Sequence, residues 1–302
     1  GMLGDHGKLA AVDRNGSVSW GELASRVVAA TDFLRDKQLP PRSRVLFIAR
    51  DSIEHQVMLF ACANLGLIIV PLSGCFSHAE VADIIEVARP SIGFAESEFA
   101  AKLEGLQGCE AVVGDSAYLE FTFAGDVPDL RGVKVSRTPL AITFTSGSTA
   151  RPKPVLFSAE GELATARLHA NLWQLNANDR VLQATAGSWI LGLSTIFVPT
   201  LASGGTVLYP ERYHPALLCD FIEEHGATVF SGVTTQFRML VNYCEQNGRR
   251  PQSSSRMVFS SAEKRDEKVF KRFEGIFGVA VFDLYASSEV RPGFGYDPAI
   301  DD

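Results

Sequence analysis

Small hydroxyl-bearing residues are concentrated in one short segment, Thr145–Thr149, which reads T-S-G-S-T and follows an apolar run. Lys153 comes shortly afterwards, between two prolines. The backbone amides and hydroxyls of such a loop can surround a phosphate without steric bulk, and a lysine adds a cation. The alternative is an ordinary solvated turn, because serine, threonine and glycine are common turn residues.

The segment differs from the phosphate loop of P-loop nucleotide hydrolases. That loop reads G-x-x-x-x-G-K-[ST], so it needs a second glycine and a lysine followed by a hydroxyl residue. After Gly147 this chain reads S-T-A-R-P-K-P. An ordinary P-loop kinase or GTPase is therefore disfavoured.

Two further polar segments come late in the chain, each after a strand-like run. The first is S-S-A-E at Ser260–Glu263, and the second is Y-A-S-S-E at Tyr285–Glu289. Taken alone, Tyr285 could be a half-buried aromatic residue of a sheet, and Glu289 could be a surface carboxylate. Their spacing within one motif, together with the hydroxyl-rich loop, makes a binding site the better hypothesis.

In sequence order, these segments resemble the motifs of the adenylate-forming superfamily, which includes acyl- and aryl-CoA synthetases, luciferases and the adenylation domains of peptide synthetases. T-S-G-S-T-x-x-P-K resembles its phosphate loop, S-S-A-E its G-G-A or G-G-E turn, and Y-A-S-S-E its Y-G-S-T-E motif. Near the start, V-S-W-G-E-L (18–23) and A-C-A-N-L-G-L-I-I-V-P-L-S (61–73) are similar to its early helix and its alanine-rich helix with the following strand. The ordered matches cover nearly the whole chain.

The resemblance implies that the chain binds ATP or AMP with Mg²⁺ and activates a small carboxylic acid. The residues implied to hold the β- and γ-phosphates are Thr145, Ser146, Gly147, Ser148, Thr149 and Lys153. Tyr285 is implied to lie against the adenine, with Ser261 and Ala262 at the other edge of that pocket. Ser288 and Glu289 are implied to be the catalytic residues, with Ser288 in contact with the α-phosphate and Glu289 as a ligand of Mg²⁺.

The substrate residues are also implied by the resemblance. Trp189, in G-S-W-I-L-G-L-S with Gly192, aligns with an aromatic residue or histidine that lines the acyl pocket in the family; core packing is the alternative for Trp189. Thr234 stands where the family's G-V-P-T turn has proline. Residues 181–209 include no acidic side chain to pair with an ammonium group, so an uncharged acyl or aryl acid is favoured over an α-amino acid. CoA or an acyl carrier protein is the expected acceptor.

Several glycines of the family motifs are replaced in this chain, which could narrow the pocket or stiffen the loops. The replacements are Ala150, Pro154, Ser260, Ser261 and Ala286. No T-G-D segment or C-terminal small domain with a catalytic lysine follows before Asp302, so we expect 2–302 to be a truncated large AMP-binding domain that adenylates very poorly. The alternative is a non-catalytic nucleotide- or acyl-binding module of the same fold. A structural protein would require the ordered matches to be coincidental.

Composition limits the other classes of function. The 302 residues are 46% hydrophobic and carry a net charge of -7 without a block of like charge, which favours a globular protein and disfavours nucleic acid as a partner. The five cysteines are scattered, which is typical of reduced thiols in a cytoplasmic protein. No membrane segment is expected, and the histidines lack metal-ligand spacing. His169 could face solvent or substrate.

Short strand-like runs alternate with helical segments, which predicts an α/β fold of two packed βα subdomains with mostly parallel sheets. We expect subregions at 2–135 and 136–302, joined through a looser connection at 115–140. Three helix starts carry the spacing of a capping box. The pairs are Ser19 with Glu22, Asp51 with Glu54, and Ser77 with Glu80.

Overall fold

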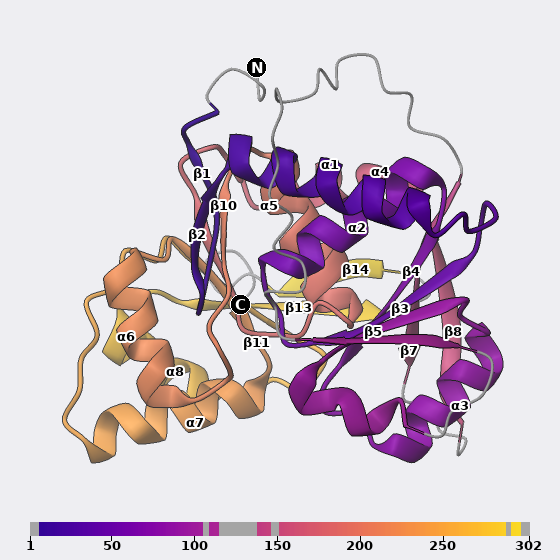
Figure 1. The fold of residues 1–302 in the computed structure, drawn as a ribbon. Helices are drawn as coiled ribbons and strands as arrows, with labels where there is room; N and C mark the ends of the chain where they lie inside the picture. The colour runs from indigo at the N-terminus through magenta and orange to yellow at the C-terminus, as the bar shows by residue number, and fades with distance from the viewer. Residues whose placement is uncertain (1–5, 105–108, 115–137, 146–150, 288–290, 297–302) are drawn as a thin grey trace. The chain divides into compact units, whose positions relative to one another are not determined.

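The protein alternates strands and helices and forms two compact units, as a computed structural model shows (Figure 1). The described residues are 6–104, 109–114, 138–145, 151–287 and 291–296. The first unit comprises 1–10, 16–165 and 187–189, and the second comprises 11–15, 166–186 and 190–302. The sheets of both units are mostly parallel, so the predicted α/β fold class is confirmed.

The first unit is built around a six-stranded sheet in the order β6-β5-β3-β4-β7-β8. Its strands are β3 (Arg44–Ala49), β4 (Ile68–Ser73), β5 (Ile92–Glu96), β6 (Glu110–Gly114), β7 (Pro139–Thr145) and β8 (Lys153–Ser158). Its helices are α1 (Trp20–Asp36), α2 (Ile53–Leu65), α3 (His78–Ala88) and a 3-10 helix (Ser97–Lys102), while α4 (Ala159–Leu172) crosses into the second unit. Helices α1 and α2 cover one face of the sheet and α3 covers the other (Figure 1).

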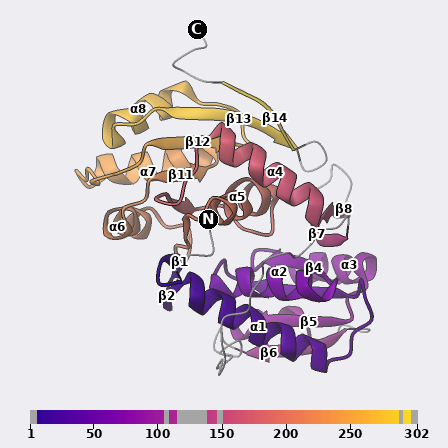
Figure 2. The ribbon, with the colours of Figure 1, turned by 90° about the horizontal axis from the view of Figure 1, so that it is seen from above.

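The second unit contains most of an eight-stranded sheet in the order β14-β13-β12-β11-β9-β10-β1-β2. The strands of this sheet are β1 (Leu9–Asp13), β2 (Gly16–Ser19), β9 (Arg180–Gln183), β10 (Thr206–Leu208), β11 (Val229–Gly232), β12 (Met257–Ser261), β13 (Val281–Ser287) and β14 (Arg291–Tyr296), of which β2 belongs to the first unit. Its helices are a π-helix (Leu191–Phe197), α5 (Val198–Ala202), α6 (Pro215–His225), α7 (Thr234–Gln246) and α8 (Glu267–Phe277). Helices α7 and α8 lie side by side against the sheet (Figure 2).

Two of the three predicted helix caps are confirmed. Ser19 and Ser77 each accept a hydrogen bond from the backbone amide three residues later, and the glutamate at that position accepts one from the backbone amide of the serine. The prediction for Asp51 is wrong, because Ser52 is the N-cap residue of α2 and its side chain makes no capping bond. The Asp51 carboxylate instead accepts a hydrogen bond from the backbone amide of Gly187 at 2.8 Å. The Asp51 carboxylate therefore makes a tertiary contact, although the residue spacing predicted that it would cap α2.

The predicted subregions, 2–135 and 136–302, stay a prediction. Residues 115–137 lie outside the described ranges, so the looser connection expected there stays a prediction. The first unit continues to Thr165, because β7 pairs with β4 and β8 pairs with β7 in the first sheet.

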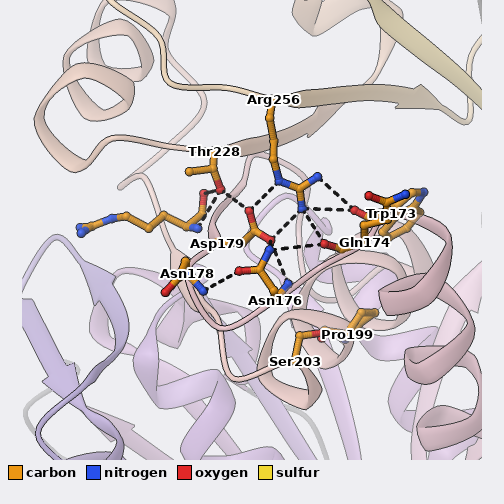
Figure 3. Close-up of polar contacts among 10 residues, drawn as sticks. Trp173, Gln174, Asn176, Asn178, Asp179, Pro199, Ser203, Thr228 and Arg256 are labelled. Carbon is orange, nitrogen blue, oxygen red and sulfur yellow. Dashed lines mark hydrogen bonds and ion pairs between the residues drawn. The ribbon is translucent and has the colours of Figure 1, made fainter.

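An ion pair with a buried carboxylate connects the amino ends of three neighbouring strands in the second unit (Figure 3). Asp179 immediately precedes β9, and its side chain is 4% exposed. The Arg256 guanidinium, just before β12, donates to both carboxylate oxygens of Asp179, at 2.7 and 2.9 Å. Thr228, just before β11, donates its hydroxyl to the same carboxylate at 2.8 Å. These bonds fix the starting positions of β9, β11 and β12.

The same arginine also binds the end of α4. Its Nη2 donates to the carbonyl oxygens of Trp173 and Gln174, at 3.2 and 3.0 Å. Helix carbonyls at a C-terminus lack partners within the helix, and a cation there is favourable. Burial raises the pKa of Asp179, but the hydrogen bonds from Arg256, Asn176 and Thr228 outweigh it, so this pKa lies below its usual range.

We expect the substitution Asp179→Asn to lower the free energy of unfolding by about 2 kcal/mol, because it removes the buried negative charge that accepts hydrogen bonds from Arg256 and Thr228. The depressed pKa means that Asp179 contributes stability above its unfolded-state pKa of about 4, and that this contribution is lost as pH falls through the lower native pKa. Urea denaturation at several pH values measures both effects. The difference in free energy of unfolding between wild type and variant should be largest at neutral pH and decrease at acidic pH.

The matched control is Glu245→Gln, which removes an ion pair with Arg272 whose two side chains are both well exposed. Solvent screens such pairs, so stability should change far less than in Asp179→Asn. Equal losses in the two variants would contradict a central role for Asp179.

Candidate functional site

The structure brings together the three residues predicted to surround the adenine. Strand β12 ends at Ser261, and its register partner on the parallel strand β13 is Leu284, so Tyr285 follows at the same end of the sheet. Ser261 is buried, whereas the Tyr285 side chain is 61% exposed. Polar residues beyond the carboxyl ends of parallel strands are where open α/β sheets bind ligands. The arrangement agrees with the predicted pocket edge, although the binding roles stay predictions.

The strained backbone residue in the turn after β12 is Ala262, which follows the two serines, Ser260 and Ser261, that replace glycines of the family motif. Ser260 and Ser261 are ordinary residues of β12, paired with Asp283 and Leu284 of β13. Ala262 adopts the left-handed conformation, with φ of 69°. That conformation is costly for a residue with a β-carbon. Among these three residues, Ala262 is therefore the one at which a glycine would be favoured.

The turn after β12 is tied to the start of α7 by two hydrogen bonds. Thr234 is buried, and its hydroxyl donates to the carbonyl oxygen of Lys264 at 3.0 Å. The Glu263 carboxylate accepts from the backbone amide of Thr235 at 2.6 Å. Negative charge at a helix N-terminus is favourable. Thr234 therefore links the two loops, a contact that the sequence comparison with a proline turn did not predict.

Gly192 lies in the π-helix, where its backbone closely approaches the preceding segment. A β-carbon at this position would lie 2.3 Å from the carbonyl oxygen of Ala186 and 2.7 Å from that of Thr185. Such contacts are far closer than van der Waals separation, so only glycine fits there. Gly192 has a packing role, and its predicted contact with substrate stays a prediction.

The structure also places the two residues that had alternative interpretations. Trp189 is 37% exposed and stacks on Phe76, with ring centroids 5.6 Å apart, so core packing is wrong as its explanation. His169 is buried, which excludes the solvent-facing alternative. Its Nδ1 lies 3.0 Å from the carbonyl oxygen of Ser194, and its ring stacks on Trp173 with centroids 4.6 Å apart.

The hydroxyl-rich loop connects two antiparallel strands of the first unit. Thr145 ends β7 and is the register partner of Lys153, which begins β8. The hairpin thus places the two flanks of the loop opposite each other, with the Lys153 side chain exposed. Residues 146–150, which include Ser146, Gly147, Ser148 and Thr149, lie outside the described ranges.

Strand β8 was not predicted, because its sequence K-P-V-L-F-S contains proline and follows another proline. Proline is tolerated in edge strands, and β8 is the edge of its sheet. Pro154 also favours an extended conformation of the preceding residue, which suits Lys153 at a strand start. The expected restriction of Lys153 by Pro154 is therefore compatible with the hairpin.

Ser288 and Glu289 also lie outside the described ranges, so their predicted contacts stay predictions. Among the residues that the structure does describe, no group of three or more His, Cys, Asp or Glu side chains could hold a metal ion. No helix in the same part of the chain is long and apolar enough to cross a membrane.

The comparison with protein families decides the membership of this chain. A family described as "AMP-binding enzyme" matches residues 4–302. The chain belongs to the AMP-binding enzyme family. The resemblance of its motifs to adenylate-forming enzymes is therefore confirmed.

Two curated relatives of this chain are longer proteins. Indoleacetate–CoA ligase of Aromatoleum aromaticum is 27% identical over 299 residues, covering 92% of this chain and 56% of that protein. Enterobactin synthase component F of Escherichia coli K12 is 24% identical over 284 residues, covering 93% of this chain and 22% of that protein. The chain thus spans about half or less of the length of these curated relatives.

Solved structures of similar proteins share the fold. A benzoate CoA ligase from Burkholderia xenovorans LB400 superimposes with a TM-score of 0.85 at 20% identity, covering 98% of this chain and 61% of that one. ATP-bound MatB from Rhodopseudomonas palustris gives 0.82 at 22% identity, covering 99% and 60%. At this identity the likeness concerns the fold, and it confirms the predicted similarity to the large domain of adenylate-forming enzymes.

We expect Ala262→Gly to raise the free energy of unfolding by about 0.5–1 kcal/mol. Glycine removes the left-handed strain of about 1–2 kcal/mol. It also increases the conformational entropy of the unfolded chain, which offsets part of this stabilisation. Urea denaturation measures the difference.

Gly278→Ala is the converse control, because Gly278 has a similar φ of 73° with no atom near its β-carbon position. It should destabilise the protein by about 1 kcal/mol. A stabilising Gly278→Ala together with a destabilising Ala262→Gly would contradict this interpretation of the turn.

Proposed function

We propose that the protein is an adenylate-forming acid ligase that activates a carboxylic acid with ATP. The observation that carries the proposal is the family match over 4–302, joined to the clustering of Ser261, Ala262 and Tyr285 at one end of a parallel sheet. The hairpin that places Thr145 opposite Lys153 supports a phosphate site on the intervening loop.

In the proposed reaction, a carboxylate oxygen of the acid attacks the α-phosphorus of ATP. The bond from this phosphorus to the oxygen that bridges to the β-phosphate breaks, so pyrophosphate leaves and an acyl-adenylate forms. The loop Thr145–Thr149 and Lys153 would hold the β- and γ-phosphates, and Ser288 would contact the α-phosphate. Glu289 is the proposed ligand of Mg²⁺, which would neutralise charge on the phosphate oxygens.

The chain's own residues would otherwise position the nucleotide. Tyr285 offers an exposed ring for the adenine, and the turn at Ser261 and Ala262 forms the proposed opposite edge. The absence of acidic side chains over 181–209 supports an uncharged acyl or aryl acid, with Trp189, Gly192 and Thr234 as proposed substrate residues. Transfer to a thiol of CoA or of a carrier protein would complete the reaction, in line with the relatives named as CoA ligases.

We expect Tyr285→Ala to weaken ATP binding about tenfold, because stacking of a base on an aromatic ring contributes about 1–3 kcal/mol. Isothermal titration calorimetry with ATP and Mg²⁺ measures the affinity. Met239→Ala is the matched control, since Met239 is an exposed apolar residue of α7 outside the proposed site. It should leave the affinity unchanged.

The same titration with Glu289→Gln tests the ligase assignment itself. Loss of Mg²⁺-dependent binding in this variant, with slow acid-dependent exchange of pyrophosphate into ATP by the weakly active wild-type chain, would support the proposal. Metal-independent binding without exchange would favour the non-catalytic module. An absence of nucleotide binding would reject both.

A further inference from the structure

The first unit presents two aromatic rings that are stacked and partly exposed. Phe76, in the loop between β4 and α3, lies against Trp189 with an interplanar angle of 18° and a centroid distance of 5.6 Å. The two residues come from segments far apart in sequence but belong to the same compact unit. Large apolar side chains at a surface cost solvation free energy, so a preordered pair of rings suggests a ligand.

The loop that carries Phe76 is held by a lysine from the 3-10 helix. Lys102 Nζ donates to the carbonyl oxygen of Gly74 at 2.5 Å and to that of Phe76. The same ammonium lies 5.6 Å from the centroid of the Phe99 ring. A partly buried lysine thus makes its hydrogen bonds with the backbone of this loop, which fixes the position of Phe76.

Packing against the Phe99 ring also restricts the position of the loop that carries Phe76. A β-carbon at Gly74 would lie 2.2 Å from the ring of Phe99, so the loop lies directly on that ring. Both Phe76 and Phe99 pack against the apolar core formed by the sheet and α3. The loop therefore rests on the core on one side and is bonded to Lys102 on another.

The position of Trp189 is restrained by contacts of the two residues that precede it. The backbone amide of Gly187 donates to the Asp51 carboxylate at 2.8 Å, and Ser188 is buried. These contacts position the residues just before Trp189. Because both rings are ordered in advance, a planar ligand that stacks on the pair would lose little conformational entropy of the protein on binding.

We propose that Phe76 is a specificity-determining residue that, by stacking on Trp189, creates a platform for the ring of an aromatic carboxylic acid. Lys102 is the positioning residue that holds this platform. The inference rests on the proposed function, because it assigns the substrate class of the same site. A planar aromatic ring gains from stacking, whereas a saturated ring of similar size does not.

Binding of free acids tests the inference without requiring turnover. The probes are benzoate and indole-3-acetate, with cyclohexanecarboxylate as the saturated counterpart of benzoate. Calorimetry should show about 3- to 10-fold tighter binding of benzoate than of cyclohexanecarboxylate. Trp189 is the most exposed of the three tryptophans, so benzoate should also change the tryptophan fluorescence, and Trp189→Phe should abolish that change.

The variants separate specificity from folding. Phe76→Ala should lower the ratio of the two affinities toward one by weakening benzoate alone, and Phe76→Tyr should restore it. Lys102→Met should lower the ratio in the same way, with Lys102→Arg restoring part of it. Leu168→Ala, at an exposed leucine of α4, is the control that should change nothing. Thermal unfolding verifies that each variant is folded.

Cys75 provides an independent readout beside Phe76. It is the exposed cysteine of the five, and burial raises the pKa of the partly buried Cys109 to about 11, which slows thiolate reactions there. Benzoate should protect Cys75 from a maleimide more strongly than cyclohexanecarboxylate does. Equal affinities of the two acids in the wild type, or an unchanged ratio in folded Phe76→Ala, would overturn the inference.

The result is distinguishable from failure of the proposed function. A chain that prefers benzoate through Phe76 but shows no nucleotide binding would retain the platform and lose the ligase assignment. A chain that exchanges pyrophosphate but does not discriminate between the acids would retain the ligase assignment and lose the platform.

Discussion

The ion pair of Asp179 and Arg256 is the interaction on which the geometry of the second unit depends. It lies at the amino ends of β9, β11 and β12, opposite the ends where the predicted nucleotide residues lie. Parallel strands are stiff and keep a common register, so fixing one end fixes the other. The buried carboxylate of Asp179 accepts several hydrogen bonds, which is the condition under which a buried charge holds a unique arrangement.

At the opposite end of these strands, hydrogen bonds restrain the loops after β11 and β12, and one loop residue has a strained backbone. Thr234 and Glu263 connect the loops after β11 and β12, while Ala262 is kept in a conformation that a β-carbon disfavours. Strained backbone persists only where the surrounding structure holds it. The two hydrogen bonds supply that restraint, and they leave the Tyr285 ring exposed beside the turn.

The first unit uses the same principle with different chemistry. Lys102 donates hydrogen bonds to the backbone of the loop at Gly74. The Asp51 carboxylate accepts a hydrogen bond from the distant backbone amide of Gly187 and does not cap a helix. Both side chains are charged, and both order backbone next to aromatic rings. Charge-assisted hydrogen bonds are stronger than neutral ones, which makes them suited to fixing loops that would otherwise move.

The sequence by itself determined the fold class, the family and much of the local structure. Alternating strands and helices, the capping boxes at Ser19 and Ser77, and the ends of α6 and α8 follow from short-range rules of periodicity and hydrogen bonding, so they were predictable. The neighbourhood of Ser261 and Tyr285 was predictable through the motifs, because parallel strands end at one edge of a sheet.

Only the tertiary structure decided the role of Asp51, the strand at Lys153–Ser158 and the position of strain at Ala262. Each depends on a partner remote in sequence or on a backbone angle, neither of which residue spacing encodes. The same holds for the Phe76–Trp189 pair, since stacking requires two segments far apart in sequence to meet. Local patterns specify elements, and long-range packing specifies which side chains those elements bring together.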